Sequence, residues 1–239
     1  MTRRTFTASV LSACACAQSS GARLLARPGA ATDNCEPGTH PLGLRSQRDA
    51  LLYVPKSADA KQPAPLVVYL HGATGSEQQG IRRLSALADE LGFLLLSPAS
   101  KGSTWDAIRD GYGPDVKDID QALTRTFQKR RVDARRIAVA GFSDGASYGL
   151  GLGLMNGDLF SSVAAFSPGF IPAGAKRNGK PRVFISHGTN DQILPIDQCS
   201  RRLAPELKRA GYPVTYEEFE GPHTVPPEIA RKAMQWLLA

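Results

Sequence analysis

Short apolar runs that alternate with amphipathic segments most strongly limit how this chain can fold. Residues 65–70 are apolar or aromatic throughout, which is typical of a strand buried on both faces of a parallel sheet. From Ser76 to Leu91 apolar residues recur at helical spacing, and Gly92 follows where a C-cap is expected. Because this alternation continues along the chain, the sequence predicts an α/β protein with a mostly parallel, doubly wound sheet flanked by helices.

The sequence has no internal repeat and no second region of different composition, which indicates one domain at 40–239. Before it, residues 18–39 are rich in Ser, Gly, Ala and Pro, as is typical of a linker. Further strands are expected at 50–54, 93–96, 136–140, 163–166, 183–186 and 214–219, and further helices at 115–129, 144–156, 197–210 and 227–238.

The first 17 residues resemble an export signal. Residues 2–6, Thr-Arg-Arg-Thr-Phe, are similar to a twin-arginine motif, and a weakly apolar stretch follows to Ala17. Cys14 ends a segment that resembles a lipoprotein box, whereas residues 15–17 offer a cleavage site instead. We expect an exported protein, periplasmic, secreted or lipid-anchored, with Cys14 as its only link to a membrane. A disordered cytosolic tail is the alternative interpretation.

The charge pattern argues against nucleic-acid binding. The formal charge is +7, but four arginines precede the first acidic residue, Asp33, so the rest of the chain carries only +3. The one dense basic cluster, at 129–136, surrounds an expected helix-to-strand turn, and we interpret it as a solvated surface. No apolar run reaches the roughly 18 residues that a membrane-spanning helix needs.

The four cysteines, at 14, 16, 35 and 199, lack the spacing of a zinc site, so no metal is expected. If export removes Cys14 or attaches a lipid to it, two cysteines remain as candidates for a disulfide between the linker and the helix after Asp191. These are Cys35 and Cys199. Two unpaired thiols are the alternative.

The motif that carries chemistry is Gly-Phe-Ser-Asp-Gly at 141–145. It lies where an expected strand meets an expected helix, the context in which G-x-S-x-G forms a nucleophile elbow. A serine held at positive φ brings backbone segments close together, and the flanking glycines remove the side chains that would clash. Ser143 is therefore the predicted nucleophile, with an inert serine in a tight turn as the alternative.

A serine hydroxyl needs a base, and four histidines are available. His40 ends the linker, and His71 and His187 each end a strand, where packing beside a glycine is the ordinary role. His223 lies beyond the last expected strand and is the predicted base. The alternative is that His223 is an ordinary residue of a surface turn.

The acid is expected between nucleophile and base in the chain. Asp191 follows the strand at 183–186 and fits this order. Its rival Asp197 directly precedes a helical pattern, so we interpret Asp197 as an N-cap. An aspartate at this place fixes the tautomer of the base and stabilises the imidazolium that forms during attack.

Two backbone N–H groups, those of Ala73 and Asp144, are the predicted oxyanion donors, because each follows the end of a strand near the expected nucleophile. Near them, His71, Thr104 and Trp105 are candidate substrate-binding residues, although an aromatic residue beside a cleft often belongs to the core.

Four ordered motifs give the chain, from about residue 63 onward, a resemblance to the α/β-hydrolase superfamily. They are Leu-His-Gly at 70–72, Gly-Phe-Ser-Asp-Gly at 141–145, His-Gly-Thr-Asn-Asp at 187–191 and Gly-Pro-His at 221–223. Within the superfamily the chain resembles the small phospholipase/carboxylesterase group and polyhydroxybutyrate-depolymerase-like esterases. The resemblance implies hydrolysis of carboxylic esters through an acyl-enzyme, without a cofactor, on a small-molecule or polymeric ester. Where those groups often have Gln or Asn, this chain has Asp144.

The segment at 167–182 is short and rich in prolines and small residues, which argues against a helical cap domain. An open, shallow cleft follows as an expectation, and with it a preference for short acyl chains of about two to six carbons. A polyester depolymerase, a lysophospholipase or thioesterase, a peptidase and an exported binding protein on a hydrolase scaffold remain alternatives.

Overall fold

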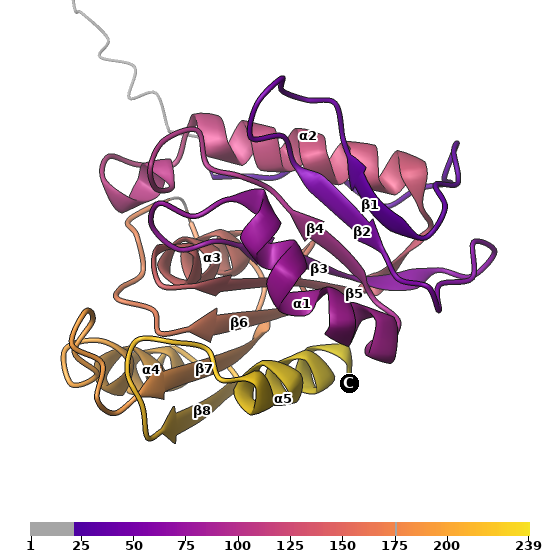
Figure 1. Ribbon diagram of the computed structural model, residues 1–239. Helices are drawn as coiled ribbons and strands as arrows, with labels where there is room; N and C mark the ends of the chain where they lie inside the picture. Colours follow the sequence, from indigo (N-terminus) through magenta and orange to yellow (C-terminus); the bar gives the residue numbers. More distant parts are fainter. Residues whose placement is uncertain (1–21, 175) are drawn as a thin grey trace, which may run out of the picture.

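The structure of the protein is a computed structural model that describes residues 22–174 and 176–239, and within them eight strands form one sheet. The expected export signal at 1–17, with Cys14, lies outside the described residues. The strands are β1 (Gly38–Pro41), β2 (Leu51–Val54), β3 (Ala64–Leu70), β4 (Leu94–Ser97), β5 (Val132–Phe142), β6 (Ser162–Phe166), β7 (Arg182–Gly188) and β8 (Val214–Phe219). The α-helices are α1 (Glu77–Leu91), α2 (Pro114–Lys129), α3 (Asp144–Met155), α4 (Ser200–Arg209) and α5 (Pro227–Leu238) (Figure 1).

The sheet has the order β1-β2-β4-β3-β5-β6-β7-β8 and is mostly parallel, as predicted. The pairs β1–β2 and β2–β4 are antiparallel, and all later pairs are parallel. In the registered pairs, Leu70 of β3 lies beside Gly141 of β5, and Phe142 lies beside Phe166 of β6. The carboxyl ends of the central strands therefore meet at one edge, where ligands bind in open α/β sheets.

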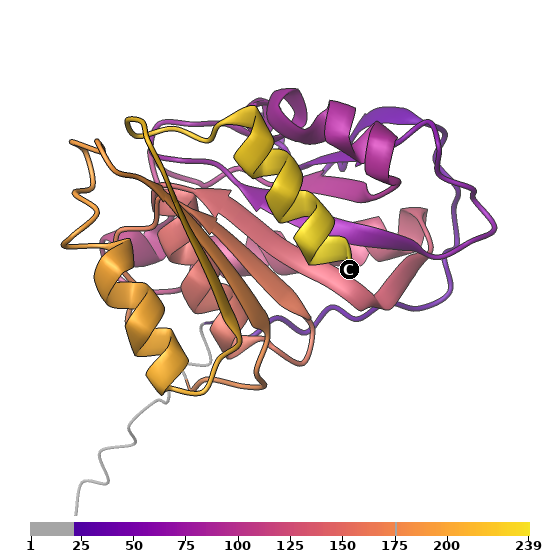
Figure 2. The same cartoon turned by 90° about the horizontal axis from the view of Figure 1, so that it is seen from below.

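Helices cover both faces of this sheet. The helices α1 and α5 bury residues such as Leu84 and Ala233 against one face, and they contact each other. The helices α2, α3 and α4 bury residues such as Leu123, Leu150 and Leu203 on the other face (Figure 2). The central strand β3 is buried at all seven positions, which explains why its sequence is continuously apolar rather than alternating.

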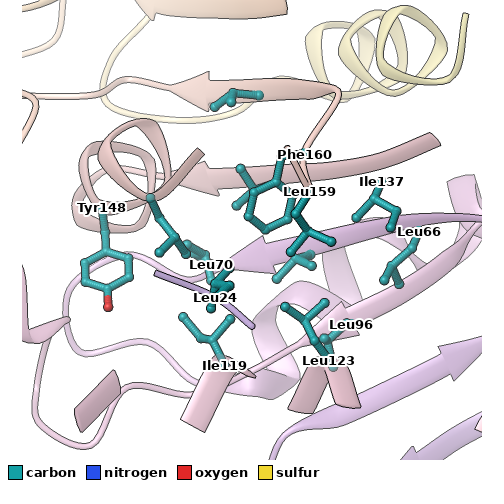
Figure 3. Close-up of a cluster of buried hydrophobic side chains, with 14 of the residues drawn as sticks. Leu24, Leu66, Leu70, Leu96, Ile119, Leu123, Ile137, Tyr148, Leu159 and Phe160 are labelled. Carbon is teal, nitrogen blue, oxygen red and sulfur yellow. The ribbon is translucent and has the colours of Figure 1, made fainter. Parts of the chain in front are cut away.

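Part of the expected linker packs against the domain. Leu24 is fully buried and lies in the core cluster with Leu70 and Ile119 (Figure 3). Its N–H donates to Oδ1 of Asn156 at 2.9 Å, and the Asn156 amide donates to the carbonyl of Ala22 at 2.8 Å. A buried leucine and a satisfied buried amide make residues 22–24 part of the folded domain.

Element boundaries differ most from expectation in three places, and elsewhere by one or two residues. The strand β1 was not expected, because it is four residues long, partly exposed and paired only with β2. The strand β5 begins at Val132, earlier than expected, and its exposed residues at 134–136 belong to the basic cluster. The helix α4 begins at Ser200 rather than 197, so the N-cap role given to Asp197 is wrong; that carboxylate pairs instead with Arg201.

The suggested disulfide is also wrong, because Cys35 and Cys199 are both free thiols. Cys35 lies beside the end of α2, with its Sγ 3.9 Å from the carbonyl of Lys129. Cys199 instead follows the carboxyl end of β7 and is the N-cap of α4. The two thiols therefore lie in different parts of the fold and form no bond with each other.

The segment between β6 and β7 has no helix or strand at 167–174 and 176–181. Of the helices in the described part of the chain, none is long and apolar enough to span a membrane.

Candidate active site

The strand β5 passes directly into α3 at Ser143, whose backbone has φ 57° and ψ −120°. This strained turn depends on the two flanking glycines. A Cβ atom at Gly141 would lie 2.2 Å from the carbonyl oxygen of Gly145, and one at Gly145 would lie 2.2 Å from that of Leu70. Only glycine fits either place, so the chain has the local structure expected of a nucleophile elbow.

The structure brings the three predicted polar side chains together. The Nε2 atom of His223 is 2.9 Å from Oγ of Ser143, and its Nδ1 atom is 2.5 Å from Oδ2 of Asp191. Asp191 follows β7 and His223 follows β8, so neighbouring parallel strands deliver both to the sheet edge above Ser143. A hydroxyl hydrogen-bonded to an imidazole that is itself bonded to a buried carboxylate is the geometry of a Ser-His-Asp triad.

Asp191 is held as an ionised acceptor. Its Oδ1 atom accepts hydrogen bonds from the N–H groups of Ile193 at 2.9 Å and Leu194 at 2.8 Å. Burial by itself would raise the pKa of Asp191, but these donors and His223 together lower that pKa below its ordinary value. The carboxylate therefore remains charged beside the imidazole at neutral pH.

Sequence reasoning missed a second histidine at this carboxylate. The Nε2 atom of His187 lies 3.1 Å from Oδ2 of Asp191 and 2.8 Å from the carbonyl oxygen of Leu194. Its Nδ1 atom lies 2.7 Å from Oγ of Ser200. The only sequence signal was that His187 and Asp191 share one short motif, whereas Ser200 was expected inside a helix.

The two predicted oxyanion donors lie beside the elbow. Asp144 is the first residue of α3, so its N–H has no acceptor within the helix. The N–H of Ala73 forms no hydrogen bond within residues 22–174 and 176–239. A Cβ at Gly72 would be 3.4 Å from Cβ of Ser143, which shows how close the loop that carries Ala73 comes to the serine.

The three candidate substrate-binding residues are buried, and their side chains bond to the loops around the elbow. Trp105 is fully buried and donates from Nε1 to the carbonyl of His71 at 2.8 Å. His71 is buried too, and its Nε2 accepts the N–H of Ser100 at 3.1 Å. Thr104 donates to Oδ2 of Asp144 at 2.5 Å. The three residues thus support the loops around the elbow, and their direct contact with a substrate stays a prediction.

The cleft is also deeper and differently placed than expected. A cavity of about 1090 Å³ borders Ser143 and His223 and extends between α1 and α5. We call it the α1/α5 groove. Its lining combines apolar residues, small residues and arginines, among them Leu87, Phe142, Val225, Ala86, Ala230, Arg82 and Arg83. Ser143 itself is only 8% exposed, so it lies at the bottom of a groove rather than on an open surface.

The base has an aromatic neighbour in this groove. The ring of Phe142 lies 4.7 Å from that of His223, centroid to centroid, and the guanidinium of Arg83 lies 5.4 Å from the Phe142 centroid. Such stacking restricts the orientation of both rings. In the part of the chain that the structure describes, no three His, Cys, Asp or Glu side chains are arranged to hold a metal ion.

A comparison with known protein families identifies the family of this chain. A family model described as Phospholipase/Carboxylesterase matches residues 114–238, just over half of the chain. The chain belongs to the phospholipase/carboxylesterase family. The match includes β5, the elbow and the residues around Asp191 and His223, whereas the loop that carries Ala73 precedes it.

Several curated relatives of this phospholipase/carboxylesterase family member are esterases. An acetylxylan esterase from Coprinopsis cinerea is 28% identical over 203 residues, which cover 66% of this chain and 53% of the relative. Feruloyl esterase B from Neurospora crassa is 28% identical over 176 residues, 70% of this chain and 54% of the relative. A bifunctional acetylxylan esterase/xylanase from Neocallimastix patriciarum is 29% identical over 63% of this chain and 22% of its own length. The chain thus spans about half, or less, of the length of these relatives, and the comparison supports an ester hydrolase.

Solved structures show the same fold. An acetyl xylan esterase from Aspergillus awamori has a TM-score of 0.63 at 17% identity, covering 84% of this chain and 98% of its own. A fluorophosphonate-binding serine hydrolase from Staphylococcus aureus has a TM-score of 0.69 at 18% identity, covering 85% of this chain and 100% of its own. The family member therefore has the α/β-hydrolase fold, and residues 22–174 and 176–239 contain no separate cap domain.

Proposed function

We propose that this protein is a serine carboxylesterase that hydrolyses its substrate through an acyl-enzyme. The observation that carries the proposal is the continuous chain of contacts from Ser143 through His223 to Asp191, built on a positive-φ serine between β5 and α3. Each of these three residues has the side-chain type and the neighbour that its role requires.

In the proposed mechanism Ser143 Oγ attacks the ester carbonyl while Nε2 of His223 takes the hydroxyl proton. The N–H groups of Ala73 and Asp144 donate to the oxyanion of the tetrahedral intermediate. His223 then gives the proton to the leaving alcohol, and water releases the acid by the same steps in reverse order. The ionised Asp191 stabilises the imidazolium throughout, and no cofactor takes part.

For the substrate we propose esters of short or compact acyl groups with bulky, including polymeric, alcohols. The relatives named for acetylxylan and feruloyl esters have acyl groups of this kind. The missing cap and the exposed residues of the α1/α5 groove, such as Arg82 and Ile193, leave room for a large alcohol. The apolar lining of the same groove favours one alternative, a lysophospholipase that buries a long acyl chain there.

Labelling with a fluorophosphonate probe tests the nucleophile. Wild-type protein is expected to be labelled at Ser143, and Ser143→Ala is expected to lose the label and to lower kcat by about 10⁴- to 10⁶-fold. Ser186→Ala is the matched control, because Ser186 is also a buried serine near the carboxyl end of a parallel strand, β7. A label on any other residue would contradict the assignment.

Hydrolysis of acetate, butyrate, octanoate and palmitate esters below their aggregation limits tests the substrate class. We expect kcat/KM to be highest for the short esters, with little loss when the alcohol is enlarged. A steep rise toward palmitate would support the lysophospholipase alternative instead.

We also propose that the protein is exported and that its partners are ester substrates, with no nucleic acid among them. The proposal rests on the twin-arginine-like segment, Arg3 and Arg4, and on the candidate lipidation site Cys14. Replacement of both arginines by lysine is expected to retain the protein in the cytoplasm. Incorporation of labelled fatty acid that is lost in Cys14→Ala would identify a lipoprotein, and its absence a cleaved soluble form.

A further inference from the structure

His187 is a fully buried imidazole that the proposed mechanism does not use. It belongs to β7, and the exposed fraction of its side chain is 0%. A buried polar ring lowers the free energy of unfolding unless its nitrogens are satisfied, so its partners indicate why it is there. Both nitrogens are satisfied, by Ser200 and by the carbonyl of Leu194, and Nε2 also lies 3.1 Å from the carboxylate that orients the proposed base.

The partners determine which nitrogen of His187 carries the proton. The two atoms near Nε2, the carbonyl oxygen of Leu194 and Oδ2 of Asp191, are both acceptors, so Nε2 must be the donor. Burial lowers the pKa of His187, so at neutral pH the ring is neutral and has a single N–H. Nδ1 is then an acceptor, and the hydroxyl of Ser200 must donate to it. The donors therefore run in one direction, from Ser200 to His187 to the carbonyl of Leu194, whose own N–H donates to Asp191.

This arrangement fixes the carboxylate of Asp191 at both oxygens. Oδ1 accepts the N–H groups of Ile193 and Leu194, and Oδ2 accepts Nδ1–H of His223 and lies 3.1 Å from Nε2 of His187. Leu194 is held twice, because its N–H bonds to Asp191 and its carbonyl accepts from His187. Rotation of the carboxylate would break bonds at both oxygens, so Oδ2 stays directed at the base.

We propose that His187, kept in one tautomer by Ser200, is a positioning residue that holds the Asp191 carboxylate in line with His223. The inference rests on the proposed function of Ser143, since it concerns the orientation of the base that activates this serine. Without the N–H of His187, the carbonyl of Leu194 loses its donor, and the segment whose N–H groups hold Oδ1 of Asp191 is less firmly fixed. The imidazole of His223 then loses a fixed reference for its own orientation.

Three variants and one control test this role. His187→Phe keeps an aromatic ring but has no donor, and His187→Gln returns an amide N–H near the place of Nε2. Ser200→Ala removes the hydroxyl that fixes the tautomer of His187. Ser186→Ala is the control, because Ser186 is buried on the same strand and its hydroxyl has no hydrogen-bond partner within the described residues. Each protein is titrated with the fluorophosphonate, so that kcat refers to competent sites only.

We expect His187→Phe to lower kcat about 10²-fold while KM changes little, as a small misplacement of a catalytic group does. His187→Gln should recover most of this loss, and Ser200→Ala should lower kcat about tenfold, as for one lost hydrogen bond. In wild type the short bond between Nδ1 of His223 and Asp191 should give a low-field proton resonance, which should move or broaden in His187→Phe and remain in Ser186→Ala.

The outcomes separate this inference from the proposed function. If wild type is not labelled at Ser143, the proposed function fails. If wild type is labelled but His187→Phe keeps its kcat and its low-field resonance, the positioning role is refuted. Equal losses in His187→Gln and His187→Phe would also refute it, because packing of the ring, not its N–H, would then matter. If His187→Phe does not fold, the comparison of Ser200→Ala with Ser186→Ala decides the question.

Discussion

Replacing Leu24 by alanine tests whether the segment before β1 belongs to the folded domain. Leu24 is fully buried among core residues from α2, α3 and the sheet (Figure 3), whereas the side chain of its neighbour Leu25 is 78% exposed. The two residues are adjacent in the chain and have the same side chain. Leu25→Ala is therefore a matched control for Leu24→Ala.

The expected effect follows from burial. Removing three buried carbon atoms from a leucine costs about 2–5 kcal/mol, and we take about 3 kcal/mol for Leu24, because its neighbours come from several elements and cannot all move to fill the space. For a domain of this size, about 3 kcal/mol lowers Tm by roughly 6–12 °C. Leu25→Ala should change the free energy of unfolding by no more than about 0.5 kcal/mol.

Thermal unfolding followed by circular dichroism, together with urea unfolding for the free energy, measures both variants under the same conditions. A single transition with an unchanged urea m-value would show that the two proteins unfold over the same surface. If Leu24→Ala and Leu25→Ala have the same Tm, the segment is not docked and the assignment of residues 22–24 to the domain is wrong.

Three further predictions concern polar groups. Asp191→Asn should lower kcat by about 10⁴-fold while Tm stays near that of wild type, measured with a p-nitrophenyl ester; a loss of less than tenfold would contradict the triad. The hydrogen bond from Arg23 is the main cause of the lowered pKa of Asp158, so this carboxylate stabilises the fold above the unfolded pKa of about 3.9 and the contribution is lost as pH falls. Asp158→Asn should accordingly show a shallower fall of Tm between pH 5 and pH 3 than wild type, with a parallel fall counting against the ion pair. Thr104→Val removes the donor to the Asp144 carboxylate beside the proposed oxyanion hole and should lower kcat about tenfold; unchanged kinetics would show that the bond does not orient the start of α3.

Much of the central fold could be predicted because its determinants are local. The apolar run of β3, the helical spacing of α1 and the glycine C-cap at Gly92 each follow from short stretches of sequence. The contact of Ser143 with His223 was also predictable, because parallel strands end at one edge and the order of the motifs along the chain is fixed.

Other features depend on contacts between distant residues. Leu24 docks against Asn156, 132 positions away, and nothing in a Ser-, Gly- and Pro-rich stretch indicates that partner. His187 resembles a packing residue until Ser200 is brought to its Nδ1, and that requires α4 to begin three residues later than its pattern indicates. The α1/α5 groove depends on how two helices lie side by side, so its lining could not be predicted from motifs at the sheet edge.

The glycines around the elbow have a consequence for directed evolution. At Gly141, Gly145 and Gly188 an added Cβ would lie within 2.4 Å of a backbone carbonyl oxygen, and backbone, unlike a side chain, cannot rotate away. A saturation library at these positions should contain almost no active member besides glycine. Ala86 and Ala230 line the groove without contributing a polar group to the proposed chemistry. Variation of substrate preference is therefore best sought at these two alanines, where a larger side chain changes the space beside Ser143 and leaves the backbone of the elbow intact.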